Sequence, residues 1–117
     1  MRGSPVVIHY FRDPDLRSRA ELASLARLRR KVLEAGVRFV VCALVDAPRF
    51  AELVEDPPAR IPLVRPRTDP PGVLAPEALP STLFLDSEGR LVWRENGVAR
   101  WDTESVIAFL KGLAGGG

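Results

Sequence analysis

The sequence predicts an α/β fold with the element order β-α-β-(α)-β-β-α, in which a four-stranded mixed sheet carries helices on both faces. Two apolar runs, residues 5–11 and 37–45, are joined by an amphipathic helical pattern, as in a right-handed parallel β-α-β unit. A hairpin pattern follows at 81–94, and a last helical pattern ends the chain. The 117 residues contain no repeat and no linker, so we expect a single domain over 1–117.

The first strand and the helix after it hold most of the polar candidates. Residues 5–11 lack clean alternation, so we expect a strand that is buried on both faces. His9, the only histidine, is expected to be a packed core residue because no second histidine offers it a shared metal. The helix is predicted to begin at Asp15 or Ser18, and Ser18 with Glu21 has the spacing of a capping box. It is expected to end at Gly36, with an apolar stripe of Leu22, Leu25, Ala26, Val32 and Leu33.

The middle of the chain combines a buried strand with a proline-rich segment. Residues 37–45 are nearly all apolar, and Cys42 among them is expected to be a small buried hydrophobe with an inert thiol. A short helix is predicted over 48–55, and its inward residues are Phe50, Leu53 and Val54. Residues 57–80 contain eight prolines, so we expect a stiff surface loop with room for one short strand at 61–64.

The last third predicts a hairpin and a helix. Residues 81–86 and 90–94 have strand composition, and Gly89 supplies the positive φ that the turn between them requires. Asp102 or Thr103 is expected to cap the final helix, and residues 114–117 to form a flexible tail. The apolar side of this helix consists of Val106, Ile107, Leu110 and Leu113.

Composition argues against several classes of protein. The net charge is only +2 and both signs are interspersed, whereas a nucleic-acid interface concentrates basic residues on one face. No apolar run reaches about 18 residues, so no membrane span is predicted. One cysteine excludes an internal disulfide, and we expect no metal and no cofactor. The chain is expected to be soluble and cytoplasmic as written, or exported if a native N-terminal segment has been removed, and its arginines and prolines suit a thermophile.

Three stretches resemble the TlpA-type branch of the thioredoxin-like superfamily. Residues 2–11 are similar to its RGKPVVLNFW segment, and residues 19–22 match the RAEL that follows its catalytic motif. Residues 79–86 with 89–92 resemble its LPTTFLID…GRIV segment. The resemblance covers nearly the whole chain and implies the thioredoxin fold, with Pro80 as the family's cis-proline beside the active site. His9 then occupies a position where thioredoxins proper carry a buried carboxylate.

The family's Cys-x-x-Cys falls on Asp15-Leu16-Arg17-Ser18, so both cysteines are replaced. Thiol–disulfide exchange needs one thiolate to attack sulfur and a second thiol to resolve the mixed disulfide, and these side chains supply neither. We therefore expect a redox-inactive domain that binds a protein or peptide in a groove beside Pro80. The expected groove residues are Phe11, Asp15, Leu16, Arg17, Ser18, Leu79, Pro80 and Ser81.

Other interpretations stay open. The groove residues could serve only to cap and pack the helix. An enzyme of another class would use Asp13 and Asp15 for acid–base work, with an anionic substrate bound by Arg12, Arg17 or Arg19. An oxidoreductase or peroxidase relative would act through Cys42, and the predicted burial of that thiol argues against it. Nothing in the sequence selects a partner or an oligomeric state.

Overall fold

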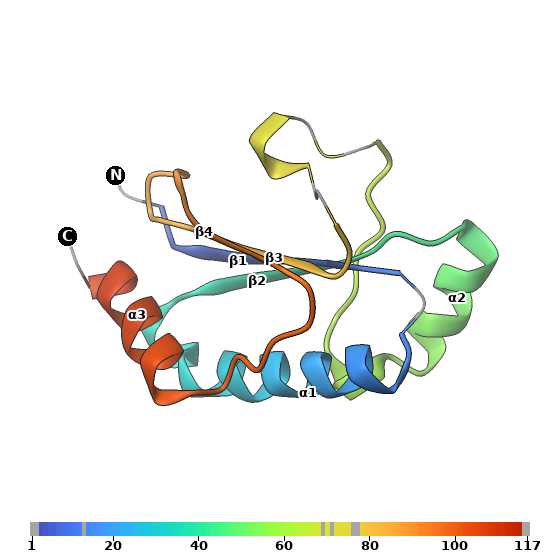
Figure 1. Ribbon diagram of the computed structural model, residues 1–117, viewed down its shortest axis with the longest axis horizontal. Coiled ribbons are helices and arrows are strands. Elements are labelled where there is room, and N and C mark those ends of the chain that lie inside the picture. Colours follow the sequence, from blue (N-terminus) through green and yellow to red (C-terminus); the bar gives the residue numbers. More distant parts are fainter. Residues whose placement is uncertain (1–2, 13, 69, 71, 76–77, 116–117) are drawn as a thin grey trace.

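The structure, a computed structural model, describes residues 3–12, 14–68, 70, 72–75 and 78–115. Its centre is a four-stranded mixed sheet with the strand order β2-β1-β3-β4 (Figure 1). β1 is parallel to β2 and antiparallel to β3, and β4 is antiparallel to β3, which confirms the predicted topology. The strands are β1 (Val6–Phe11), β2 (Arg38–Ala43), β3 (Ser81–Leu85) and β4 (Leu91–Asn96).

Three α-helices accompany the sheet, namely α1 (Leu16–Lys31), α2 (Ala47–Glu55) and α3 (Glu104–Gly115). Figure 1 shows α1 along the underside of the sheet, between α3 at one end and α2 at the other. None of the helices in the described part of the chain is long and apolar enough to cross a membrane.

The two faces of the sheet are covered differently. Apolar side chains of all three α-helices join one core cluster with strand residues such as Val7, Val41 and Phe84. The opposite face carries a smaller cluster around Tyr10, Cys42 and Leu83. The proline-rich loop covers this second face, where the described helical cover is the 3-10 helix η3 (Gly72–Leu74) (Figure 1).

Capping residues set where the helices begin. Asp15, Asp46 and Thr103 each accept a hydrogen bond through their side chain from the backbone N–H three residues later. Of the two residues predicted to cap α1, the structure uses Asp15, and of the two predicted for α3 it uses Thr103. Gly36, with φ +80°, follows the 3-10 helix η1 (Leu33–Ala35) that extends α1.

Four sequence predictions about the elements are wrong in detail. Leu33 is 65% exposed because the α-helix has already ended at Lys31, so the 3.6-residue period no longer applies. Val54 is half exposed rather than inward. The strand predicted at 61–64 is reduced to a single parallel bridge between Val64 and Cys42. Helix α3 runs through residue 115, into the segment 114–117 predicted as a flexible tail, of which 116 and 117 lie outside the described residues.

Candidate binding site beside Pro80

Two segments that are far apart in the chain leave the sheet at the same end. Tyr10 pairs with Ser81 across β1 and β3, so the residues after Tyr10 and those before Ser81 lie beside one another. After β1 the chain turns into α1, and before β3 it passes through Leu79 and Pro80, which are joined by a cis peptide bond. The N-terminus of α1 and the segment that leads into β3 therefore share one end of the sheet (Figure 1).

The side chain of Asp15 caps helix α1. Its Oδ1 accepts the backbone N–H of Ser18 at 2.8 Å, and this bond holds the pKa of the exposed carboxyl below its usual value. Asp13, its proposed partner in acid–base work, lies outside the described residues. The basic residues around this turn, Arg12, Arg17 and Arg19, are all exposed.

Leu16 follows the cap with 86% of its surface in solvent. A single exposed leucine is ordinary on a protein surface. This one, however, stands at the first position of α1, at the end of the sheet that also carries the half-buried Leu79 and Pro80. The three side chains provide apolar surface beside the charges of Asp15 and Arg17.

Two residues predicted to line the groove are not on the surface. Phe11 is 1% exposed and belongs to the core cluster, where its ring stacks on His9 with centroids 6.1 Å apart. Ser81 is fully buried between β1 and β4, and its hydroxyl donates to Asn96 Oδ1 at 3.1 Å. Neither side chain can contact a ligand, because the sheet and the core already enclose both. The surface residues that remain, which we call the Pro80 site, are Asp15, Leu16, Arg17, Ser18, Leu79 and Pro80.

The backbone groups of Leu79 and Pro80 differ in their hydrogen bonding. The carbonyl of Pro80 accepts the N–H of Gly97 at 2.7 Å, which ties this turn to the end of β4. Within the described residues, Leu79 makes no backbone hydrogen bond. Its N–H and C=O are the groups with which an extended segment could pair, as in recognition by strand addition.

Cys42, the only cysteine, lies away from this site. It belongs to the cluster on the sheet face opposite α1, where burial raises the pKa of its thiol to about 11. The reactive form of a cysteine is the thiolate, which is scarce at neutral pH when the pKa is this high. Cys42 is therefore not an activated nucleophile in this structure. In the described part of the chain no cluster of histidine, cysteine, aspartate or glutamate could hold a metal ion.

The core contains a buried polar pair that the sequence did not reveal. Glu21 is 1% exposed and faces His9, with Oε1 of the carboxylate 3.7 Å from Nε2 of the imidazole. Nδ1 of His9 hydrogen-bonds the hydroxyl of Thr82 at 2.8 Å. The prediction that Glu21 completes a capping box is therefore wrong. Burial lowers the pKa of His9 to about 4 and raises the pKa of Glu21.

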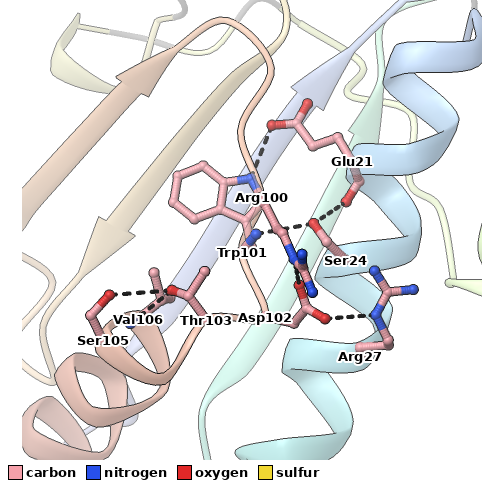
Figure 2. A network of polar contacts seen from close by, with 9 residues as sticks. All are labelled: Glu21, Ser24, Arg27, Arg100, Trp101, Asp102, Thr103, Ser105 and Val106. Atoms are coloured by element: carbon pink, nitrogen blue, oxygen red, sulfur yellow. Dashed lines mark hydrogen bonds and ion pairs between the residues drawn. The ribbon is translucent and has the colours of Figure 1, made fainter.

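The other carboxylate oxygen of Glu21 holds the segment between β4 and α3. Figure 2 shows the carboxylate reaching the indole N–H of Trp101, which donates to Oε2 at 2.9 Å, and the backbone N–H of Ala99 donates to the same oxygen at 3.0 Å. Ser24 Oγ accepts the backbone N–H of Trp101 at 3.1 Å. These bonds hold the buried Trp101 and its backbone against α1.

A second link between the same segments lies nearer the surface. Arg27 on α1 and Arg100 both donate through Nε to Asp102, at 2.7 and 3.0 Å (Figure 2). The two guanidinium groups lower the pKa of the Asp102 carboxyl to about 2. Asp102, one of the two predicted helix caps, thus pairs with arginines and leaves the cap to Thr103.

One sequence signal could have located Glu21. Residues 21, 25, 28 and 32 follow the spacing of one helix face, and all four are buried in the structure. Glu21 therefore stands within the apolar stripe, in line with Leu25 and Leu28. A carboxylate there requires buried donors, and Trp101 is the residue from the far end of the chain that supplies one.

Solved structures with the same arrangement are thioredoxin-like proteins. A putative thiol:disulfide interchange protein DsbE from Chlorobium tepidum has a TM-score of 0.75 at 16% identity, over 97% of this chain and 82% of that one. StoA from Bacillus subtilis has a TM-score of 0.66 at 13% identity, over 97% and 84%. A secreted Mycobacterium tuberculosis disulfide oxidoreductase has a TM-score of 0.61 at 19% identity, over 98% and 83%.

At these identities the likeness concerns the fold. No protein-family model matches the sequence, and no curated protein matches it. The sheet order, the position of α1 and the full-length superposition agree with one another. The chain has the thioredoxin-like fold of DsbE- and TlpA-like proteins, with a single cysteine in its sequence and none at the start of α1.

Proposed function

We propose that this chain is a redox-inactive thioredoxin-like domain that binds an extended segment of a partner protein at the Pro80 site. The observation that carries the proposal is Leu16, which is 86% exposed at the position between the two cysteines of a Cys-x-x-Cys motif. Asp15 and Ser18 stand where the thiols would be and bind each other across the helix cap. The start of α1 therefore presents an exposed apolar side chain, but it lacks the thiols that exchange disulfides.

The chemistry of the site suggests what kind of segment it takes. Leu79 offers an N–H and a C=O, which pair with an extended backbone regardless of its sequence. Leu16 adds an apolar contact, so a segment with one apolar side chain would bury surface there. Asp15 and Arg17 are exposed charges of opposite sign at the rim, and such groups affect selectivity more than affinity.

The test is selection of peptides from a random library on the immobilised chain, followed by measurement of Kd for the enriched peptides by fluorescence anisotropy. Leu16→Asp should weaken binding by about tenfold or more, since it places a charge in the apolar contact. Leu33→Asp is the matched control, because Leu33 is also an exposed leucine and lies beyond the opposite end of α1. Its Kd should equal that of the wild type.

Two outcomes contradict the proposal. One is a library that yields no peptide enriched on the chain over an unrelated immobilised protein. The other is a set of bound peptides whose Kd values are the same for Leu16→Asp and Leu33→Asp, which would move the binding surface elsewhere. Both substitutions fall on side chains in solvent, so loss of folding does not complicate the comparison.

A further inference from the structure

The sheet face opposite α1 carries a pocket that the proposed peptide site does not use. The pocket has a volume of about 340 Å³ and lies between the ends of β1 and β2 and the proline-rich loop. That volume is at the small end of the range for ligand pockets. We name it the Tyr10 pocket, and its lining includes Tyr10, Cys42, Val64, Arg65, Arg67 and Leu74.

The inner wall of the Tyr10 pocket offers a hydroxyl to a ligand. Tyr10 is 4% exposed and lines the pocket, and among the described residues no hydrogen bond to its hydroxyl is found. A phenol O–H that lines a pocket is a donor that a ligand can use. Burial raises the pKa of Tyr10, so the hydroxyl keeps its proton and can donate. Beside it Cys42 adds a thiol, which is only a weak donor.

The outer wall is basic. Arg65 and Arg67 line the pocket from the loop, and no acidic residue of the described chain lines it. Arg65 donates through Nε to the carbonyl of Val45 at 2.9 Å, which anchors the side chain. No partner for its two terminal nitrogens is found in the described part of the chain, so they can bind a ligand. Planar guanidinium groups of this kind match the geometry of a carboxylate. The remaining wall consists of the apolar side chains of Val64, Leu74 and two prolines of the loop, together with Thr68.

We propose that the Tyr10 pocket binds a small organic carboxylate with an apolar body. The carboxylate binds the guanidinium groups of Arg65 and Arg67, and the body packs against Val64 and Leu74. A polar atom at the far end of the ligand accepts the hydroxyl of Tyr10. This site is separate from the Pro80 site and does not depend on peptide binding there.

The test uses four probes whose binding is measured by titration calorimetry on the wild-type chain: 4-hydroxybenzoate, benzoate, the neutral 4-hydroxybenzamide and inorganic phosphate. The expected order is 4-hydroxybenzoate tighter than benzoate, and both about tenfold or more tighter than the neutral amide. Inorganic phosphate should bind more weakly than benzoate, since it has no apolar body. Phosphate that binds as tightly as benzoate would overturn the apolar part of the site.

Two variants separate the two ends of the pocket. Arg67→Glu should weaken 4-hydroxybenzoate about tenfold or more, whereas Arg30→Glu, the same charge change on an exposed position of α1, should leave Kd unchanged. Tyr10→Phe removes only the hydroxyl and should abolish the advantage of 4-hydroxybenzoate over benzoate. Leu16→Asp, which alters the Pro80 site, should leave the Kd for 4-hydroxybenzoate unchanged. The two proposals can therefore fail independently of each other.

Cys42 provides an independent readout, because it is the only thiol and lines the pocket. Saturating 4-hydroxybenzoate should slow the labelling of the native chain by a maleimide several-fold. The proposal is overturned if none of the aromatic probes binds, or if Arg67→Glu and Tyr10→Phe bind as the wild type does. Arg67 is exposed, so its variant remains informative even if the Tyr10 variant fails to fold.

Discussion

The imidazole of His9 and the carboxylate of Glu21 face each other inside the core, 3.7 Å apart, and these facing atoms make no hydrogen bond. Each side chain makes a hydrogen bond through its other polar atom, His9 with Thr82 and Glu21 with Trp101. Burial opposes charge on both, lowering the pKa of His9 and raising that of Glu21. The pair is therefore the part of the fold whose stability should respond most to pH.

We expect the free energy of unfolding to fall on the acid side because of His9. Its pKa is about 4 in the folded chain and 6.5 when unperturbed, so between these values the unfolded chain binds a proton that the folded chain does not. The contribution of His9 is fully present above pH 6.5 and is lost as the pH falls toward 4. It amounts to up to about 3 kcal/mol, measured by urea unfolding at a series of pH values.

Glu21 acts in the opposite direction over part of the same range. Its raised pKa means that the folded chain holds this proton at a higher pH than the unfolded chain, so its contribution is present below 4.5 and lost as the pH rises through the folded pKa. Glu21→Gln removes this offset and should steepen the loss on acidification. His9→Gln should flatten the profile, and an unchanged slope between pH 6.5 and 4 in that variant would rule out His9 as the cause.

The two hydrogen bonds to Glu21 predict different effects for two substitutions at that position. Glu21→Gln keeps an oxygen that can accept both the Trp101 indole N–H and the Ala99 N–H, and it removes a buried charge. Its free energy of unfolding at neutral pH should match or exceed that of the wild type. Glu21→Ala leaves both donors without an acceptor and should lose about 2–4 kcal/mol.

A surface carboxylate provides the control for this comparison. Glu34 is exposed in η1, and Glu34→Gln and Glu34→Ala should both stay within about 0.5 kcal/mol of the wild type. Equal destabilisation by Glu21→Gln and Glu21→Ala would show that the charge itself, rather than the hydrogen bonds, stabilises the segment between β4 and α3.

The sequence predicted the architecture because local patterns encode most of it. The strands and helices follow from local signals in the sequence. These signals are two apolar runs, the turn at Gly89 and the caps at Asp15 and Thr103. One error arose where a local rule competes with a long-range contact. Glu21 satisfies the capping-box pattern, but Trp101, eighty residues later, provides the donor that takes its carboxylate into the core.

The candidate site was predictable only in part. The resemblance to the TlpA-type family implied that Asp15, Leu16 and Pro80 lie near one another, but it could not show that Phe11 and Ser81 are buried there. Burial of these two depends on how α1 and the neighbouring strands close over them. The Tyr10 pocket left no pattern in the sequence, because it forms between strand ends and a loop whose path the prolines restrict without specifying.

Cys42 should react slowly in the native chain. With its pKa raised to about 11, the thiolate fraction near pH 8 is smaller by about a hundredfold than for an ordinary thiol with the unperturbed value of 9.0. Burial restricts access as well, so labelling by a disulfide reagent should be more than about a hundredfold slower in buffer than in urea. Cys42→Ala is the blank, and native labelling as fast as in urea would restore Cys42 as a candidate nucleophile.

Two cysteines introduced at the start of α1 should give the chain disulfide-reductase activity. The wild-type chain should not reduce the disulfides of insulin, because Asp15 and Ser18 supply no thiols. The double variant D15C/S18C should do so in the presence of a small dithiol, since a thiol at a helix N-terminus has a lowered pKa and the second cysteine resolves the mixed disulfide. Turbidity of precipitating insulin measures the rate.

Matched variants test whether the insulin-reducing activity depends on the position of the thiols or only on their presence. The variant D15A/S18A should be inactive, and D15C alone should form mixed disulfides that turn over far more slowly than in the double variant, because no thiol at position 18 resolves them. Leu33→Cys adds a thiol beyond the far end of α1 and should also be inactive. Activity of the wild type that disappears in Cys42→Ala would contradict a redox-inactive domain, since it would show that the single native thiol turns over.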